Sequence, residues 1–226
     1  MNVTALPEVE QARFNMVEQQ VRPWFVFDPN ILQALSTVSR ENFTPPSLQN
    51  LAFSDVEIPL IIDGTDTHEV MLTPKVEARL AQDLLLQPDD CVLEIGTGSG
   101  YQAALLASQA QQVTSVEIDS RIATFGEQNL RHNNISNVTV EVGDGHKGWG
   151  NTEYDAILLT GSLPVMPDHF KYQLTVGGRL IVTIGQAPIM TVYRITRTSA
   201  ASFDTVALFD TVIKPLRGAK ISQFKF

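Results

Sequence analysis

The stretch VLEIGTGSGYQAALLA, residues 92–107, decides the fold expected for this chain of 226 residues. An apolar run ending at Ile95 is typical of a buried strand, a glycine-rich loop follows it, and a helix is predicted from Tyr101. Glycines in such a loop allow positive φ and let the main chain approach a ligand closely. Because open α/β sheets bind ligands at the carboxyl ends of their strands, the loop predicts a binding site there.

Strand and helix patterns alternate outward from this loop. Strands are predicted at residues 91–95, 113–118, 138–142, 154–159, 179–184, 192–195 and 203–209. Helices are predicted between them at residues 101–109, 120–132 and 167–173. This alternation, with continuous apolar strands, indicates an α/β fold with a doubly wound, mostly parallel seven-stranded sheet. Only residues 196–202 separate the last two strands, which predicts an antiparallel C-terminal strand.

The first 72 residues differ in pattern and predict an N-terminal helical layer. A helix is expected over residues 7–21, and a second one starts at Pro29 with Asp28 as its N-cap. The sequence DGTD at residues 63–66 is typical of a turn or loop. From residue 73 onward strand and helix patterns alternate regularly, which predicts a domain boundary between residues 1–72 and 73–226.

Composition excludes several classes of protein. With 43% apolar residues the chain can build a core, which excludes a disordered chain. Its formal charge of −9 disfavours nucleic-acid and membrane-surface partners. Cys91 is the only cysteine, so no internal disulfide can form. No apolar run approaches the ~20 residues of a membrane span, and the first residues show no export signal. We therefore expect a cytoplasmic protein with no metal site. The sequence does not give the oligomeric state, and a monomer is favoured.

The spacing of the glycines indicates which ligand the loop binds. Gly96, Gly98 and Gly100 occupy alternate positions, whereas a dinucleotide loop places its third glycine three residues after the second. Preceded by an acid, the pattern E-x-G-x-G-x-G resembles the S-adenosylmethionine loop of Rossmann-like methyltransferases. The cofactor-binding residues predicted in this loop are Glu94, Gly96, Thr97, Gly98, Ser99 and Gly100.

Polar residues at the ends of the following strands extend the predicted cofactor site. Glu117 lies twenty-one positions after Gly96, where a carboxylate can accept both hydroxyls of a ribose. In the methyltransferases that the loop resembles, an acid and its neighbour after the third strand edge the adenine pocket. A solvated strand-end charge at Glu117 and a simple Asp-Gly turn are the alternative interpretations. The remaining predicted residues are Ile118, Asp144, Gly145 and Thr160.

Further motifs, in order along nearly the whole chain, resemble the protein-L-isoaspartate O-methyltransferase family. They include MVEQQVRP, SRENFTPP, LAFSDVEIPL, VEVGDGHKGW, YDAILLTGSLPVMP and VGGRLIVTIG. The resemblance implies methylation of the free α-carboxylate of isoaspartyl residues in damaged proteins and peptides, with S-adenosylmethionine as cofactor. It assigns residues 1–72 to a substrate-side layer and 73–226 to the catalytic domain. Because this carboxylate is already ionised at neutral pH, positioning groups suffice and no general base is needed.

One position departs from the family pattern. The family has Thr-Ile-Ser-x-Pro, in which the serine hydroxyl contacts the substrate carboxylate. Aligned on Pro74, this chain has VMLTP, so Leu72 stands at the hydroxyl position, and leucine cannot donate a hydrogen bond. A different acceptor, or cofactor binding without catalysis, is therefore the alternative hypothesis. Candidates to replace the hydroxyl are Thr65, Thr67, His68 and Thr73, although capping of the next helix is the favoured role of Thr73.

Overall fold

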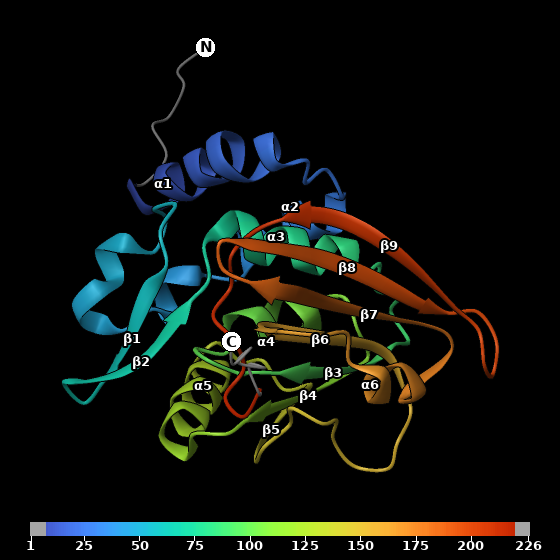
Figure 1. The fold of residues 1–226 in the computed structure, drawn as a ribbon. Helices are drawn as coiled ribbons and strands as arrows, with labels where there is room; N and C mark the ends of the chain where they lie inside the picture. Colours follow the sequence, from blue (N-terminus) through green and yellow to red (C-terminus); the bar gives the residue numbers. More distant parts are fainter. Residues whose placement is uncertain (1–7, 220–226) are drawn as a thin grey trace.

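A seven-stranded sheet forms the centre of the computed structural model, which describes residues 8–219 (Figure 1). Its strands are β3 (Cys91–Ile95), β4 (Gln112–Glu117), β5 (Val138–Val142), β6 (Tyr154–Leu163), β7 (Leu174–Gln186), β8 (Ile189–Arg197) and β9 (Phe203–Asp210). All seven predicted strands are confirmed. Strands β6, β7 and β8 extend beyond the residues predicted for them.

The strands lie in the order β5-β4-β3-β6-β7-β8-β9. From β5 to β7 neighbouring strands are parallel, whereas β8 is antiparallel to both β7 and β9. The expected C-terminal antiparallel pair is therefore β8 and β9. The chain runs from β3 to β4 and β5 on one side, then crosses to β6 on the other side of β3. Ligand sites of open α/β sheets lie where the strand order reverses in this way.

Both faces of the sheet are buried. Successive strand residues point to opposite sides, and the residues on each side belong to a hydrophobic cluster. Val92 and Leu158 belong to one hydrophobic cluster, and their neighbours Leu93 and Ile157 belong to another, which includes Phe170. The helices that pack on the sheet are α3 (Pro74–Asp83), α4 (Tyr101–Ala107), α5 (Ser120–His132) and α6 (Asp168–Tyr172). Burial on two faces explains why the central strands are continuous apolar runs.

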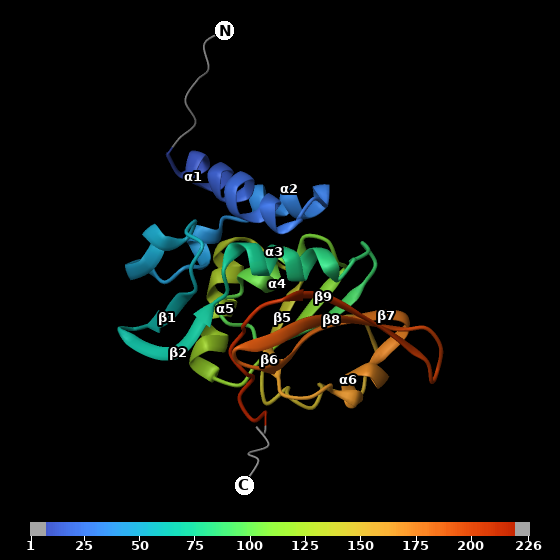
Figure 2. The ribbon, with the colours of Figure 1, turned by 45° about the horizontal axis from the view of Figure 1, so that its top comes forward.

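The N-terminal layer starts with α1 (Glu8–Met16), which continues as a π-helical turn (Val17–Val21). Pro7, where this helix was expected to begin, lies outside the described residues. Helix α2 (Pro29–Thr37) has the predicted cap: Asp28 Oδ1 accepts from the Asn30 and Ile31 amides at 2.8 and 3.2 Å. Helices α1 and α2 lie together on the outer side of α3 (Figures 1 and 2).

A β-hairpin in this layer was not predicted. Strand β1 (Ile58–Ile62) pairs antiparallel with β2 (Thr65–Met71), so the layer is not wholly helical. Asp63 and Gly64 form its two-residue turn with φ of +50° and +75°. Such turns match the twist of the strands that they join. The predicted turn is therefore correct for residues 63–64, and the hairpin lies beside α5 in both views (Figures 1 and 2).

Helix α3 begins at Pro74 as expected, but the Thr73 hydroxyl does not cap it. The Thr73 carbonyl accepts from the Val76 and Glu77 amides at 3.1 Å each, whereas Oγ1 is buried without a partner among the described residues. One hydrophobic cluster contains residues on both sides of the predicted boundary at residue 72, and the division into two units stays a prediction. Within residues 8–219, no helix is both long and apolar enough to span a membrane.

Candidate active site

A cleft with a volume of about 120 Å³ opens at the carboxyl ends of β3 and β6. The glycine loop, the end of β2, residues 143–146 after β5 and residues 213–217 after β9 form its walls. The predicted site residues that line it are Leu72, Gly96, Thr97, Gly98, Ser99, Glu117, Ile118, Asp144, Gly145 and Thr160. The structure thus brings together residues that are far apart in the chain. They meet at the carboxyl ends of the strands, where the sequence predicted the binding site.

The glycines are required by the shape of the loop. Gly96 has φ of +101°, and a Cβ there would lie 2.2 Å from Thr160 Oγ1, which instead lies 2.8 Å from the Gly96 carbonyl oxygen. Gly98 has φ of +54° and borders the cleft. Gly100, with φ of +85°, does not line the cleft: a Cβ there would lie 2.8 Å from the Gly126 carbonyl oxygen in α5. Its predicted ligand contact is therefore replaced by packing between loop and helix.

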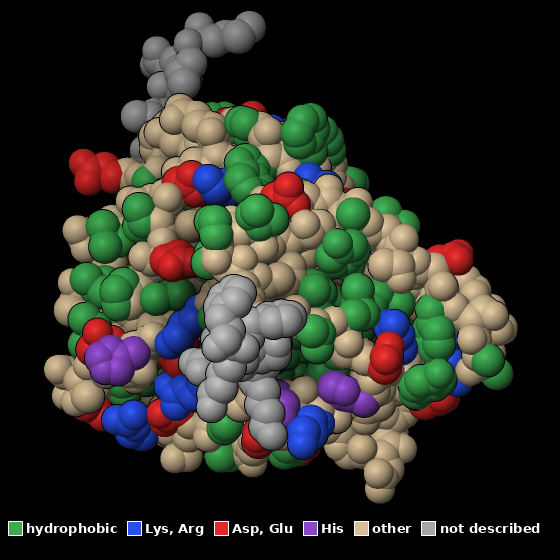
Figure 3. Space-filling model, viewed as in Figure 1, with side chains coloured by type: hydrophobic (Ala, Val, Ile, Leu, Met, Phe, Trp, Pro, Cys, Tyr) green, Lys and Arg blue, Asp and Glu red, His purple; other side chains and the backbone are tan. Residues whose placement is uncertain are grey.

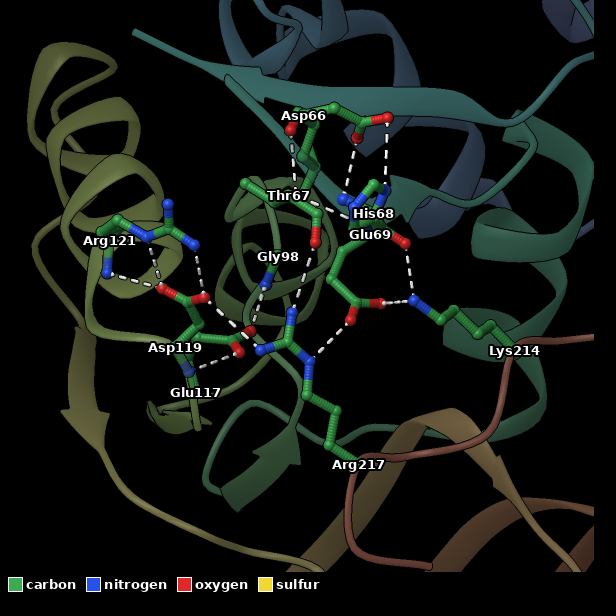
Figure 4. Close-up of polar contacts among 11 residues, drawn as sticks. Asp66, Thr67, His68, Glu69, Gly98, Glu117, Asp119, Arg121, Lys214 and Arg217 are labelled. Carbon is green, nitrogen blue, oxygen red and sulfur yellow. Dashed lines mark hydrogen bonds and ion pairs between the residues drawn. The ribbon is translucent and has the colours of Figure 1, made fainter.

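Glu117 ends β4 with its carboxylate held by two main-chain amides (Figure 4). Gly98 N donates to Oε2 and Asp119 N donates to Oε1, both at 3.1 Å. Burial raises the pKa of Glu117, and these two hydrogen bonds oppose that change. Each oxygen keeps a second lone pair for a hydroxyl donor, so Glu117 is more than a solvated strand-end charge.

The Asp144–Gly145 segment lines the cleft on the side of β5. Asp144 Oδ1 accepts from the amide and from Nδ1 of His146, at 3.2 and 2.7 Å, and these donors lower the pKa of Asp144. A Cβ at Gly145 would lie 2.8 Å from Ile95 Cδ1, so the main chain packs directly against the apolar end of β3. This segment forms a wall of the cleft as well as a turn.

Glu94 lies beneath the glycine loop and not in the cleft wall. It is completely buried and accepts a short hydrogen bond from Ser115 Oγ, which lies 2.6 Å from Thr97 Oγ1. Burial raises the pKa of Glu94 to about 8, against the effect of the Ser115 hydrogen bond. The sequence predicted a ligand contact, whereas the structure gives Glu94 a supporting position, because strand alternation and the turn at Gly96 leave it under the loop.

The wall around Leu72 is held by a buried arginine. Arg40 is 1% exposed, and its guanidinium donates to the Leu72 carbonyl at 2.7 Å, to the Ala52 carbonyl at 2.9 Å and to Glu77 Oε2. The same group stacks over the Tyr101 ring, 4.8 Å from its centroid. Burial lowers the pKa of Arg40 to about 10, so it stays a cation at neutral pH.

None of the candidates for the missing hydroxyl lines this cleft. Thr67 Oγ1 donates to the Leu60 carbonyl at 2.9 Å within the hairpin, and Thr65 and His68 border a separate, exposed hollow. Thr73 borders another hollow, beside Trp24. Thr65, Thr67 and His68 lie on the hairpin and Thr73 lies after it, and none of the four side chains borders the cleft in this arrangement of the chain. The replacement of the hydroxyl by one of them stays a prediction.

Residues 213–217, which we call the C-terminal strap, close the cleft opposite the glycine loop. The strap pairs with β6: Ser162 N donates to the Lys214 carbonyl, and Leu216 N donates to the Ser162 carbonyl, both at 3.0 Å. Arg217 donates to Glu69 at 2.7 Å and lies 3.4 Å from Asp119, so it bridges β2 and the end of β4 (Figure 4). Figure 3 shows basic side chains next to acidic ones on this face.

A sequence model of the Protein-L-isoaspartate(D-aspartate) O-methyltransferase family matches residues 11–218. The chain belongs to this family. The Protein-L-isoaspartate O-methyltransferase of Rhodopseudomonas palustris is 37% identical over 207 residues, which are 91% of this chain and 93% of that protein. Protein-L-isoaspartate O-methyltransferase 2 of Pelobacter propionicus is 35% identical and covers 97% of this chain, with 96% of its own length aligned.

A solved structure named for the same family has the same fold. It is a protein-L-isoaspartate O-methyltransferase chain from Plasmodium falciparum in complex with S-adenosyl-L-homocysteine. It matches 94% of this chain and 99% of its own length with a TM-score of 0.77 at 17% sequence identity. At this identity the likeness extends to the fold alone.

In this member of the family, sequence reasoning missed three buried polar residues at the cleft: Arg40, Glu77 and Gln102. Glu77 and Gln102 line the cleft directly, and Arg40 supports it from behind. A local signal existed, because Glu77 falls on the apolar face of α3 and Gln102 is the single polar residue in the helical run YQAALLA between Tyr101 and Ala107. Within residues 8–219, no group of three or more His, Cys, Asp or Glu could hold a metal ion.

Proposed function

We propose that this chain is an S-adenosylmethionine-dependent methyltransferase that methylates the α-carboxylate of isoaspartyl residues in peptides and proteins. The observation that supports S-adenosylmethionine as the cofactor is the position of Glu117, whose carboxylate borders the cleft next to Gly98. Membership of the family supports the acceptor, because the relatives are named for isoaspartate methylation. The net charge of −9 and the mixed surface charge favour a protein acceptor over a nucleic acid (Figure 3).

The residues of the cleft fit this cofactor. Glu117 offers acceptors for two ribose hydroxyls, and the glycine loop puts bare main chain against the ligand. Ile118 and Gly145 line the part of the cleft that would hold the adenine ring, with Asp144 beside them. When bound, S-adenosylmethionine supplies an activated methyl group on a positively charged sulfur.

The chain itself has to position the acceptor and keep water out. An ionised carboxylate with a pKa of about 4 needs no base at neutral pH, so none of the cleft residues has to take a proton. Holding two reactants in line lowers a barrier by roughly 7–11 kcal/mol. Met71, Leu72 and Ile213 line the acceptor side with apolar surface, which excludes water from the reacting atoms.

An assay with an isoaspartyl peptide and its matched aspartyl peptide tests the proposal. With methyl-labelled S-adenosylmethionine, we expect a base-labile methyl ester on the isoaspartyl peptide alone. S-adenosylhomocysteine binding without ester formation would contradict the isoaspartyl carboxylate as the acceptor and favour a different acceptor beside Leu72. Failure to bind S-adenosylhomocysteine would contradict S-adenosylmethionine as the cofactor. A monomeric state and a cytoplasmic location stay predictions, to be tested by light scattering and by fractionation.

A further inference from the structure

Charged side chains of the hairpin and of the C-terminal strap separate the cleft from an exposed hollow. Glu69, Lys214 and Arg217 line the cleft, and the same three side chains line the hollow, which has a volume of about 500 Å³. Asp119 and Arg121 border the hollow on the side of β4 and α5. A ligand that enters the cleft from this side therefore has to pass between the hairpin and the strap.

Glu69, in β2, is the centre of this cluster (Figure 4). Its Oε1 accepts from Arg217 Nε at 2.7 Å, and its Oε2 accepts from Lys214 Nζ at 2.8 Å. Both cations belong to the strap, so a single carboxylate holds the strap to the hairpin at two points. We call Glu69, Lys214 and Arg217 the latch.

Main-chain carbonyls of the hairpin add to these ion pairs. Lys214 Nζ donates to the His68 carbonyl at 2.5 Å, and Arg217 donates to the Thr67 carbonyl at 3.4 Å. His68 has φ of +63°, a conformation that is rare for residues other than glycine and persists where the surrounding contacts hold it. Arg217 also lies 3.4 Å from Asp119, so the latch extends to the end of β4, where the ribose is proposed to bind.

The size of the cleft indicates that the strap has to move when a cofactor binds. The cleft has a volume of about 120 Å³, whereas pockets for cofactors usually measure roughly 300–1,000 Å³. Exposed ion pairs are individually weak, and the side chains of Arg217 and Lys214 are 41% and 44% exposed. The latch can therefore open while the buried sheet stays folded.

We propose that the latch is a gate, which opens to let the cofactor enter and leave and closes the strap over it. The inference rests on the proposed function for the identity of the ligand. Because the ion pairs of the latch do not involve the ligand, they stabilise the closed form of the free and of the bound protein alike. Weakening the latch therefore raises the rate constants of binding and release together and leaves the Kd nearly unchanged.

Exchange of S-adenosylhomocysteine tests the gate. Displacement of labelled, prebound ligand by excess unlabelled ligand gives koff, calorimetry gives the Kd, and their ratio gives kon. Glu69→Gln keeps the side-chain size and removes the charge that both cations contact. We expect koff and kon each to rise about fivefold, with the Kd changed by less than about twofold. Glu153→Gln, which breaks the 2.7 Å ion pair with Arg197 outside the cleft, is the matched control and should exchange as wild type.

A second variant tests whether the latch acts as one unit. Arg217→Met keeps one of the two ion pairs of Glu69, so we expect a smaller increase in koff than in Glu69→Gln. The double variant should release the ligand no more than about twofold faster than Glu69→Gln, because the two changes remove a shared interaction. Raising the salt concentration from about 0.05 to about 0.5 M should speed release from wild type, since salt screens exposed charges.

Hydrogen exchange in the ligand-free protein tests the gate without any cofactor. Leu216 N donates to the Ser162 carbonyl, so this amide exchanges with solvent when the strap leaves β6. We expect its exchange to be about fivefold faster in Glu69→Gln than in wild type. The amides of β3, which pairs with β4 and β6, should exchange as in wild type and show that the variant is folded.

The outcomes separate the gate from the proposed function. An unchanged exchange rate at Leu216, or a rise in koff with an unchanged kon, overturns the gate even if the enzyme forms methyl ester. Faster exchange at Leu216 in a protein that does not bind S-adenosylhomocysteine supports the gate while the cofactor assignment fails. Faster ligand exchange in a protein that forms no ester supports the gate while the acceptor assignment fails.

Discussion

The main-chain amide of Gly98 donates to Oε2 of Glu117 across 3.1 Å. This bond ties the middle of the glycine loop to the end of the neighbouring strand. The same carboxylate therefore orders the loop and borders the cleft. A substitution at this position acts on the ligand and on the loop together, which makes Glu117 the most sensitive single test of the cofactor site.

Replacing Glu117 by Gln should weaken S-adenosylhomocysteine binding by roughly 10–100-fold. The change removes charge from an acceptor of hydroxyl hydrogen bonds, each worth about 1.5–3 kcal/mol when the acceptor is charged. Calorimetry gives the affinity directly. Glu127→Gln, which changes an exposed carboxylate of α5 paired with Arg131, is the matched control and should bind as wild type. Equal affinities in all three proteins would contradict the assignment of Glu117.

Replacing Leu72 by Ser should raise kcat/KM for an isoaspartyl peptide at least about tenfold over Leu72→Ala. Leu72 lines the cleft and carries no hydroxyl, whereas a serine there could donate to the acceptor carboxylate. Leu72→Ala controls for the lost volume because it removes the isobutyl group without adding a donor. Steady-state kinetics on the peptide measure the difference. If the serine and alanine variants react equally well, residue 72 does not touch the acceptor.

Replacing Arg40 by Met should destabilise the fold by about 3–5 kcal/mol, because the Glu77 carboxylate would stay buried without its counter-ion. Urea unfolding at neutral pH measures this. The double variant Arg40→Met with Glu77→Leu removes both charges, and we expect it to recover most of the loss. A single variant as stable as wild type would show that the pair contributes nothing.

Glu94 makes stability depend on pH. Its pKa is raised to about 8 by burial, against about 4.3 in an unfolded chain, so the folded state holds the proton more tightly. The resulting stabilisation is complete below the unfolded pKa and is lost as pH rises through about 8. The free energy of unfolding of wild type, minus that of Glu94→Gln, should therefore fall by more than about 1 kcal/mol between about pH 5.5 and 8.5. A difference that stays flat across this range would mean that Glu94 ionises normally in the folded protein.

The central sheet could be predicted because its strands are buried on both faces and therefore leave continuous apolar runs, as in β3 and β6. The hairpin of β1 and β2 was missed although Asp63–Gly64 is a strong two-residue turn signal. The pairing register of its strands shifts between Pro59 and Ile61, and burial does not alternate regularly along either strand, so the period-2 pattern is weak in the sequence.

Some residues of the candidate site could likewise be predicted from the sequence and others could not. Residues next to the glycine loop or at strand ends, such as Glu117, could be placed from motif spacing alone. The position of Thr73 could not, because adjacent residues of an extended segment point to opposite sides, so Leu72 borders the cleft and the Thr73 hydroxyl does not. Arg40 and Glu77 meet only through packing of segments 37 residues apart, which no local pattern encodes.

The strap that crosses from β9 back to Ser162 follows the last strand of the sheet in the sequence, and it supplies one side of the cleft. Domains are synthesised from the N-terminus and begin to fold in that order. A nascent chain that has emerged only as far as β9 therefore has all the strands of the sheet but lacks one wall of the cleft. The stabilisation that a bound ligand gives by mass action is therefore complete only after the sheet has formed and the strap has closed the cleft.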